Sequence, residues 1–551
     1  MLQGPIQRGN LMCSQALITG AILETYNEIV EANASRPRCL SAESVAVLEL
    51  RGSVFGRQFD RYGAVWVGGV EVMRTTTPEP NGQNTIFWTV ERDVTSYLSL
   101  FLEEEKTVAA VSIPNEVTSE YTGIIEANVT LKVYEGSTSR PADVVKALVP
   151  LDASPWTAMG DVSDLDFRLP VRNANRVLLD LYASGHSCEE FWYQNLPGNG
   201  TCGGGAFREL EISIDGVVAG IAAPFPVVYS GGINPLAWRP IAGVAQFDVP
   251  PYRFDLTPFA GLLNDGANHT MRILVVDQTH VWYIDPVLLV WTDDSYRRLE
   301  GAILETDETP RRVALTTLGD NHFLTVGSHG FSVTGDLRNN AVVVSTTTVA
   351  GTLALRDDNQ IFSDSRQVTT QRSEVTTRVA TAGEGARNLT LRDDFSIYVD
   401  LLDTSSLVDA NITLARSRTL LATNTEEIVT WSSAAKAAAQ LTSEDADSDY
   451  GVARTDAVFQ VVVDDDDDDD RVATPAACFE ATAEAKDGFF VANTASDFDC
   501  RLPGTHRFCG LDLCDLFAPS PSFRRGGAGA NNNTSSPTVV AFSTTTSSSS
   551  S

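Results

Sequence analysis

One supersecondary plan occurs twice in this chain, about 150 residues apart, and this duplication limits the folds available to it. Each copy has a hairpin turn, a proline eight or nine residues later, and then an Asp-Val/Leu-Thr segment that leads to an apolar strand. The landmarks are Gly68–Gly69, Pro78 and Asp93 in the first copy, and Asp215–Gly216, Pro224 and Asp255 in the second. An arginine precedes each turn, Arg61 and Arg208. The period is too long for a solenoid and predicts two tandem domains.

The local patterns predict an all-β fold. Short runs rich in Val, Ile, Thr and aromatic residues recur between clusters of Gly, Pro, Asn and Asp up to about residue 430. In ELEISIDGVVAG, Leu210 and Ile212 alternate with polar residues, and Asp215–Gly216 closes a two-residue hairpin loop. Repeated hairpins without long helices between them are typical of β-sandwiches, here two jelly-roll-like sandwiches in tandem. We expect helices only at 15–34, as one short amphipathic helix, and in the Ala-rich stretch 432–447.

Composition shifts divide the chain into seven predicted segments. Boundaries are expected near the Val149-Pro150 junction and after Trp291, and a run of aspartates at 464–470 indicates a solvated linker. The segments are an N-terminal segment (1–43), a first jelly-roll β-sandwich (44–148), a second (149–293), a C-terminal β-rich domain (294–431), an acidic low-complexity linker (432–477), a small Cys-rich patch (478–519) and a disordered Ser/Thr/Gly tail (520–551).

The charge excludes some partners. The chain has 72 acidic and 40 basic side chains, and its net charge of −32 disfavours nucleic acid and anionic lipid. No run of 18 apolar residues predicts a membrane span. No Cys/His spacing suggests a zinc site, so we expect no metal and no cofactor.

Cysteines and sequons favour an oxidising compartment. The eight cysteines fall into local groups, which suits disulfides, with Cys188 and Cys202 as one expected pair. Asn-x-Ser/Thr sequons occur throughout, and those expected to carry glycans are Asn128, Asn199, Asn268, Asn388 and Asn411. We therefore expect a secreted protein or one of the endomembrane lumen. No signal peptide is identified, so the N-terminus is interpreted as incomplete.

Three loops combine carboxylates, arginines and aromatic residues. The first contains Asp60 and Arg61, although an Asp beside an Arg at a strand entry is usually a structural ion pair. The second, CEEFWY from Cys188, sets two glutamates beside three aromatics that would desolvate a carboxylate and raise its pKa; the alternative is an acidic loop over a buried tryptophan. The third, GGINPLAWRPIAG at 231–243, is the main insertion of the second copy, where Trp238 could stack on a sugar or plug the core. Glu79 is interpreted as a turn residue.

These segments resemble a known family. FDRYGAVWVGGVEVMRTTTPEP, EEFWYQN, APFPVVYSGGINPLAWRPIAGV and HVWYIDPVLLVW are similar to the plant and fungal-type peptide:N-glycosidase A family, strongly over 44–295 and diffusely over 296–430. A more distant similarity links the chain to the bacterial peptide:N-glycosidase F proteins. The resemblance implies two tandem jelly rolls with the active site at their junction, and an amidase that releases N-linked glycans by cleaving the bond between glycan and asparagine.

The resemblance also implies roles for particular residues. The primary catalytic acid falls on Asp60, and the second catalytic carboxylate on Glu190, with the adjacent Glu189 as the alternative. Glu116 is the nearest match to a third glutamate. The residues assigned to substrate binding are Arg61, Glu189, Trp192, Trp238 and Arg239. In this interpretation Arg61 keeps Asp60 ionised, so that Asp60 can activate water.

The expected substrates are N-glycosylated peptides and glycoproteins. Three other functions stay open: a non-catalytic glycan-binding protein, a glycoside hydrolase acting between sugars, and an adhesin or wall protein.

Overall fold

The computed structural model describes residues 9–497 except 27, 81, 83, 103–105, 137–144, 146, 152–156, 160–161, 199, 201, 240, 364, 385, 423–426, 443–448, 464–475 and 488. The regular secondary structure of the described residues is almost entirely antiparallel β-strand, in five sheets, so the all-β prediction is confirmed. Two short α-helices, α1 (Ser99–Leu102) and α2 (Ala260–Leu263), and four 3-10 turns accompany them. Among the described residues, no helix has the length and apolar character needed to span a membrane. The predicted tail and most of the Cys-rich patch lie outside the described residues.

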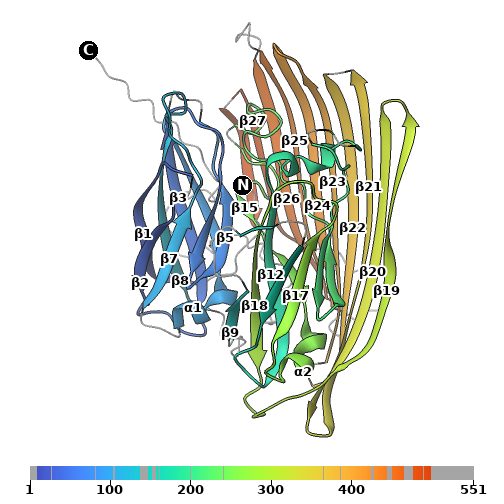
Figure 1. Ribbon diagram of the computed structural model, residues 1–551. Helices are drawn as coiled ribbons and strands as arrows, with labels where there is room; N and C mark the ends of the chain where they lie inside the picture. Colours follow the sequence, from blue (N-terminus) through green and yellow to red (C-terminus); the bar gives the residue numbers. More distant parts are fainter. Residues whose placement is uncertain are drawn as a thin grey trace.

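The first sandwich is drawn in blue in Figure 1. One of its sheets has the order β1-β8-β3-β6, and the other has the order β15-β5-β4-β7-β2. The bounds are β1 Leu11–Leu23, β2 Val30–Ser35, β3 Val45–Phe55, β4 Tyr62–Val67, β5 Val70–Thr76, β6 Ile86–Asp93, β7 Lys106–Ser112, β8 Ile124–Tyr134 and β15 Asp248–Val249. The region expected to form a helix at 15–34 instead contains β1 and β2. There Leu17, Ile18 and Ala21 are buried because β1 pairs along its length with β8.

The second sandwich, drawn in green, lies beside the first (Figure 1). Its sheets have the orders β10-β18-β12-β16, with β9 also pairing β18, and β11-β17-β13-β14. The bounds are β9 Ala147–Pro150, β10 Thr157–Met159, β11 Val162–Phe167, β12 Ala174–Gly185, β13 Leu210–Ile214, β14 Val217–Ala222, β16 Tyr252–Asp255, β17 His269–Val275 and β18 Trp282–Thr292. Apart from β15 in the first sandwich and β9 in the second, the strand orders of the two sandwiches match, so the duplication is confirmed in three dimensions.

The two copies also share the residues that form their turns. Asp93 accepts a hydrogen bond from the Thr95 amide at 2.8 Å, and Asp255 accepts the equivalent bond from Thr257 at 2.9 Å. Each forms an Asx turn that starts a 3-10 turn and a short helix. The hairpin of the second copy places Asp215 and Gly216 at φ of 49° and 83°, as a type I′ turn requires.

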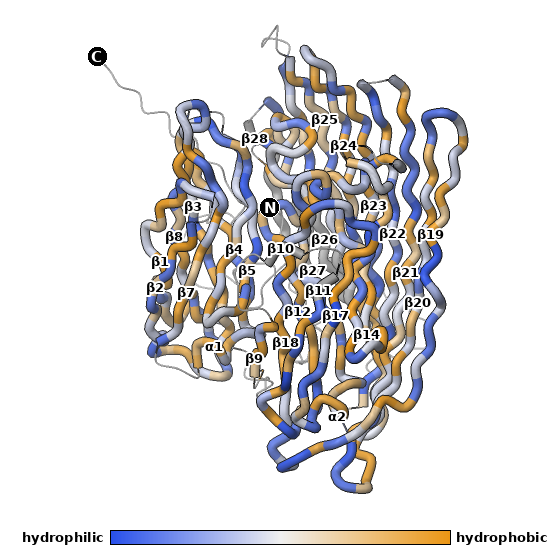
Figure 2. The backbone as a smooth tube through the Cα atoms, in the orientation of Figure 1, coloured by the Kyte–Doolittle hydropathy of each residue, from blue (hydrophilic) through white to orange (hydrophobic). Residues whose placement is uncertain are grey.

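A single ten-stranded antiparallel sheet follows in chain order from β19 to β28 and stands as a tall wall beside the second sandwich (Figure 1). The bounds are β19 Ile303–Gly319, β20 His322–Asn339, β21 Val342–Ser363, β22 Arg366–Gly383, β23 Arg387–Asp403, β24 Leu407–Ala422, β25 Glu427–Thr442, β26 Tyr450–Val463, β27 Ala476–Lys486 and β28 Phe489–Asp497. Hydrophobic and hydrophilic residues alternate along its strands (Figure 2). Its inner face shares one core with the second sandwich, in which Phe331 and Val333 lie with Phe207 and Phe259.

The Ala-rich stretch expected to be helical is strand β25. Ala435, Ala437 and Ala439 are buried at alternate positions, and β25 pairs with β24 on one side and with β26 on the other. These two ladders satisfy the backbone and outweigh the helix propensity of alanine. Part of the segment expected to be a linker, 432–477, therefore lies in this sheet. The other domain boundaries stay predictions.

The two sandwiches meet through buried polar contacts as well as apolar ones. The Trp66 indole N–H donates to Asp285 at 2.8 Å, and Arg92 pairs with Asp248 at 2.6 Å. Strand β15, from the second copy, pairs with β5 of the first. The loops at the ends of β4, β5 and β12 are thereby held at this junction.

Candidate active site

Asp60 is positioned by the entry to strand β4 and by a loop of the second sandwich. It is half-buried, and its Oδ2 accepts a hydrogen bond from the Gly231 amide at 2.8 Å. Burial raises the pKa of Asp60 above its ordinary value, and the Gly231 hydrogen bond and the Arg61 charge oppose that increase. Asp60 is therefore a desolvated carboxyl at the junction and not part of a surface ion pair.

Glu79 lies beside Asp60, on the loop that follows β5. A Cβ atom on Gly231 would stand 1.9 Å from Glu79 Oε2 and 2.8 Å from Asp60 Oδ1, so both carboxylates converge on this glycine. The Glu79 amide donates to Ser230 Oγ at 2.9 Å, which fixes its loop against the same segment. Burial and then the Asp60 charge raise the pKa of Glu79 to about 7, with Arg239 opposing them. The interpretation of Glu79 as a turn residue missed this position.

Glu190 is the third carboxyl of the cluster. It follows the 3-10 turn Ser187–Glu189 after β12 and is half-buried. Burial and then the charge of Asp60 raise its pKa to about 7. The adjacent phenol of Tyr229 has its pKa raised by burial, and the charges of Glu190 and Asp60 add to this effect. Asp60, Glu79 and Glu190 hereafter form the carboxyl cluster, in which like charges and burial keep part of the protons bound at neutral pH.

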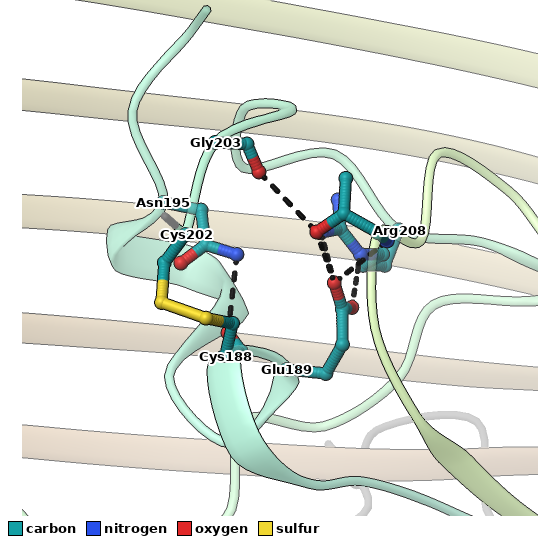
Figure 3. The surroundings of a disulfide bond; sticks show 7 residues. Cys188, Glu189, Asn195, Cys202, Gly203 and Arg208 are labelled. Atoms are coloured by element: carbon teal, nitrogen blue, oxygen red, sulfur yellow. Dashed lines mark hydrogen bonds and ion pairs between the residues drawn. A yellow bond between two sulfur atoms is a disulfide. The ribbon is translucent and has the colours of Figure 1, made fainter. Parts of the chain in front are cut away.

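Glu189 is excluded from the cluster by its own partners (Figure 3). Its side chain is 0% exposed and forms two hydrogen bonds with Arg208, at 2.6 and 2.8 Å. Trp282 Nε1 donates to it at 2.8 Å, and the Thr279 amide at 2.9 Å. Burial alone would raise the pKa of Glu189, but these donors, led by Arg208, lower it to about 2. Glu189 is thus a structural anion, and its assignment to substrate binding is not supported by the geometry.

Arg61 does not bind the carboxyl cluster in this structure. Its guanidinium donates to Gln58 Oε1 at 2.7 Å and to Tyr26 Oη at 3.4 Å. Its charge is the weakest of the influences on the pKa of Asp60, which is raised overall. Arg61 thus favours the ionised form of Asp60 only against the larger effect of burial, and the expectation that it keeps Asp60 ionised stays a prediction.

The residues expected to bind sugar fall into two groups. Trp192 and Trp238 are 3% and 1% exposed and belong to the core, so Trp238 follows the core-plug alternative. Arg239 is half-buried, and its Nη2 lies 3.8 Å from Glu79 Oε1. Glu116, the sequence match for a third glutamate, is exposed, and Glu79 occupies the cluster instead.

The expected Cys188–Cys202 disulfide is present and ties the CEEFWY segment to the following loop (Figure 3). A second disulfide joins Cys13 and Cys39. Of the sequon asparagines, Asn268, Asn388 and Asn411 are exposed and Asn128 is half-exposed. Asn199 lies outside the described residues.

One group within the described part of the chain has the spacing of a metal site: Glu209, Glu211 and His329. Arg311 already pairs with both glutamates, and His329 Nδ1 hydrogen-bonds Glu209 at 2.6 Å. This group lies between the second sandwich and the ten-stranded sheet, where the arginine supplies the balancing charge.

Comparisons with known proteins agree with the sequence resemblance. The family model described as peptide N-acetyl-beta-D-glucosaminyl asparaginase amidase A matches residues 3–309. Peptide-N4-(N-acetyl-beta-glucosaminyl)asparagine amidase A of Prunus dulcis is 36% identical over an alignment of 359 residues. The alignment covers 59% of this chain and 62% of that protein, so the chain spans less than two thirds of the relative's length.

Two solved structures are similar at low identity. PNGF-II has a TM-score of 0.37 at 12% identity, over 51% of this chain and 66% of that one. PNGase F, a glycosylasparaginase from Flavobacterium meningosepticum, has a TM-score of 0.35 at 16% identity, over 51% and 96%. Since the family model covers more than half of its residues, this chain belongs to the peptide N-acetyl-beta-D-glucosaminyl asparaginase amidase A family.

Proposed function

We propose that this protein is an amidase that releases N-linked glycans from glycopeptides and glycoproteins by hydrolysing the amide between N-acetylglucosamine and asparagine. The observation that carries the proposal is the carboxyl cluster at the junction of the two sandwiches. Family membership supports it, because the Prunus dulcis relative is described as an amidase of this kind.

The carboxyl cluster contains both the base and the acid that amide hydrolysis needs. Ionised Asp60 removes a proton from a water molecule, whose oxygen attacks the asparagine side-chain carbonyl carbon. The C–N bond then breaks, and the leaving nitrogen takes a proton from Glu190 or Glu79, whose pKa values of about 7 keep a protonated fraction near neutral pH. The products are a glycosylamine and a peptide in which Asp replaces Asn, with the oxygen of the water in its carboxyl group.

The compartment and the partners are also proposals. The two disulfides and the accessible sequons favour a secreted or endomembrane-lumen protein that meets N-glycosylated proteins there. The glycan-binding residues proposed here are Arg239, whose guanidinium lies 3.8 Å from Glu79 of the carboxyl cluster, and Arg61, which follows Asp60 in the chain.

A glycopeptide incubated in heavy-oxygen water tests the proposal. We expect release of the whole glycan and one heavy oxygen in the new Asp, and we expect Asp60→Asn to lower the rate by at least about 100-fold because the base is lost. Mass spectrometry of both products reads the outcome. A sugar left on Asn would show a glycoside hydrolase, which also uses paired carboxyls. Binding of the glycopeptide without any product would show a non-catalytic glycan-binding protein.

A further inference from the structure

We infer that the ten-stranded sheet is part of the catalytic apparatus, because it clamps the 231–243 loop from behind, with Asn234 as the positioning residue that keeps the Gly231 amide on Asp60. The inference goes beyond the proposed function and depends on it only for its kinetic test. The family model ends at residue 309, so nearly all of this sheet lies outside the matched region.

Asn234 is the main tie between the loop and the sheet. It is 0% exposed, and its Nδ2 donates to two carbonyls on neighbouring strands, Val408 of β24 at 3.0 Å and Ala439 of β25 at 3.1 Å. Its Oδ1 accepts from the Leu236 amide at 3.0 Å. One buried amide therefore joins two strands of the sheet to the tip of the loop, and removing it would break all three of these hydrogen bonds.

Two further contacts extend the clamp along β26. The Thr455 hydroxyl donates to the Ala242 carbonyl at 2.7 Å. A Cβ on Gly451 would stand 2.2 Å from the Leu236 carbonyl oxygen, so the loop rests directly on the strand backbone. Ile233, next to Asn234, has φ of 66°, a conformation that a β-branched residue adopts only where the surroundings impose it.

The opposite side of the same loop carries the contacts with the carboxyl cluster. Gly231 donates to Asp60, Ser230 Oγ accepts from the Glu79 amide, and Arg239 lies 3.8 Å from Glu79. The loop is therefore held between the sheet and the cluster. A loop released by the sheet would no longer fix the Gly231 amide at 2.8 Å from Asp60.

The consequence for titration has a definite sign. A hydrogen bond to a carboxylate favours its ionised form, so losing the Gly231 bond raises the pKa of Asp60. The other groups that lower the pKa of Asp60 are its own backbone amide and Arg61, and the charge of Asp60 in turn raises the pKa of Glu79, Glu190 and Tyr229. None of these groups hydrogen-bonds Asn234. If Asp60 is the base, the acid limb of the pH–rate profile moves to higher pH.

The test uses three variants of the full chain. Asn234→Ala removes the hydrogen bonds from the loop to β24 and β25. Thr455→Val removes the hydrogen bond from β26 to the Ala242 carbonyl without changing the size of the side chain. Asn264→Ala is the matched control: Asn264 is also 0% exposed, and its side chain makes two hydrogen bonds to backbone, both with Ala174 and away from the loop, where Asn234 makes three.

Two readouts are expected to change together. In Asn234→Ala the acid limb of kcat/KM for a glycopeptide should move up by about one pH unit, which is a tenfold loss below the limb, with little change above it. Thr455→Val should show a smaller shift in the same direction. Hydrogen exchange of the peptide that contains the Gly231 amide should be faster in both, whereas Asn264→Ala should change neither readout.

The outcomes separate this inference from the proposed function. An active wild-type enzyme whose limb and exchange are unchanged in Asn234→Ala would overturn the inference. An inactive wild-type enzyme would overturn the proposed function, and the exchange experiment would still decide whether the sheet clamps the loop. A uniform fall in rate at every pH, equal to that of Asn264→Ala, would show a structural role only and would also overturn the inference.

Discussion

At the scale of residues, two adjacent glutamates have opposite properties because of what each side chain contacts. Glu189 turns inward to Arg208, Thr279 and Trp282, and its pKa is lowered to about 2. Glu190 faces the junction, where burial and Asp60 raise its pKa to about 7. Neighbours in sequence thus serve stability and chemistry separately.

Substitution of each glutamate should separate these two roles. Glu189→Gln leaves Arg208 as a buried, uncompensated cation and should destabilise the protein by about 3–5 kcal/mol. Glu190→Gln should reduce glycan release strongly and leave thermal stability unchanged or higher at pH 8, because the native glutamate must ionise there in a buried site. Thermal unfolding and glycopeptide assays of the two variants provide each other's control. Equal effects on stability would contradict the distinction.

The directions of these two pKa shifts also determine how the stability of the protein depends on pH. Because the folded pKa of Glu189 is below its ordinary value of 4.5, its contribution is complete above pH 4.5 and is lost as the pH falls toward 2. Glu190 has the opposite sign: its raised pKa disfavours the folded state as the pH rises through 7.

The residue patterns pointed to the loops of two members of the carboxyl cluster, the family resemblance assigned Asp60 and Glu190 within them, and both missed the third member. Asp60 and Glu190 stand beside aromatics and arginines that are visible locally, but Glu79 depends on Gly231, far away in sequence. The repeat did contain a signal: Pro78-Glu79-Pro80 of the first copy matches Pro224-Phe225-Pro226 of the second, so a glutamate stands where the other copy has a buried phenylalanine. Burial of Trp238 was not decidable from its neighbours, since an exposed loop and a core plug have the same local sequence.

At the scale of elements, the turns and the β-rich character of 294–431 were predictable, whereas strand β25 was expected to be a helix. Gly, Pro and Asp residues mark the hairpins because the backbone conformations they adopt are local properties. Strand β25 pairs with β24 and β26 along most of its length, and that pairing is a tertiary property which an alanine-rich sequence does not reveal.

The loop after β14 offers an element-scale test at Gly231. The added methyl group of Gly231→Ala would stand 1.9 Å from Glu79 Oε2, while the backbone there does not need a left-handed conformation. The carboxyl cluster must therefore open, and a displacement of about 1 Å should lower kcat/KM by about 100-fold with little change in thermal stability. Gly319→Ala, which meets nothing within 4 Å, is the control. Activity near that of the control would contradict the placement of the cluster.

At the scale of the whole molecule, the three parts share their cores. Adjacent residues of β12, Leu178 and Leu179, are both 0% exposed but belong to different clusters, one with the first sandwich and one with the ten-stranded sheet. Val287 and Leu288 of β18 divide in the same way. Because side chains alternate along these strands, one face of their sheet packs in the core of the first sandwich, and the other face packs in the core shared with the ten-stranded sheet. This sheet is hereafter called the common wall.

A common wall predicts one cooperative unfolding transition. Phe101→Ala in the first sandwich, Phe207→Ala in the second and Ile397→Ala in the ten-stranded sheet each open a cavity at a side chain that is at most 2% exposed. Each should cost about 2–5 kcal/mol and move the same calorimetric transition to lower temperature. Val343→Ala, at a side chain that is 51% exposed, should leave it in place. Two resolved transitions, of which each variant moves one, would show instead that the sandwiches and the sheet unfold separately and that the clamp on the 231–243 loop can open without loss of the fold around Asp60.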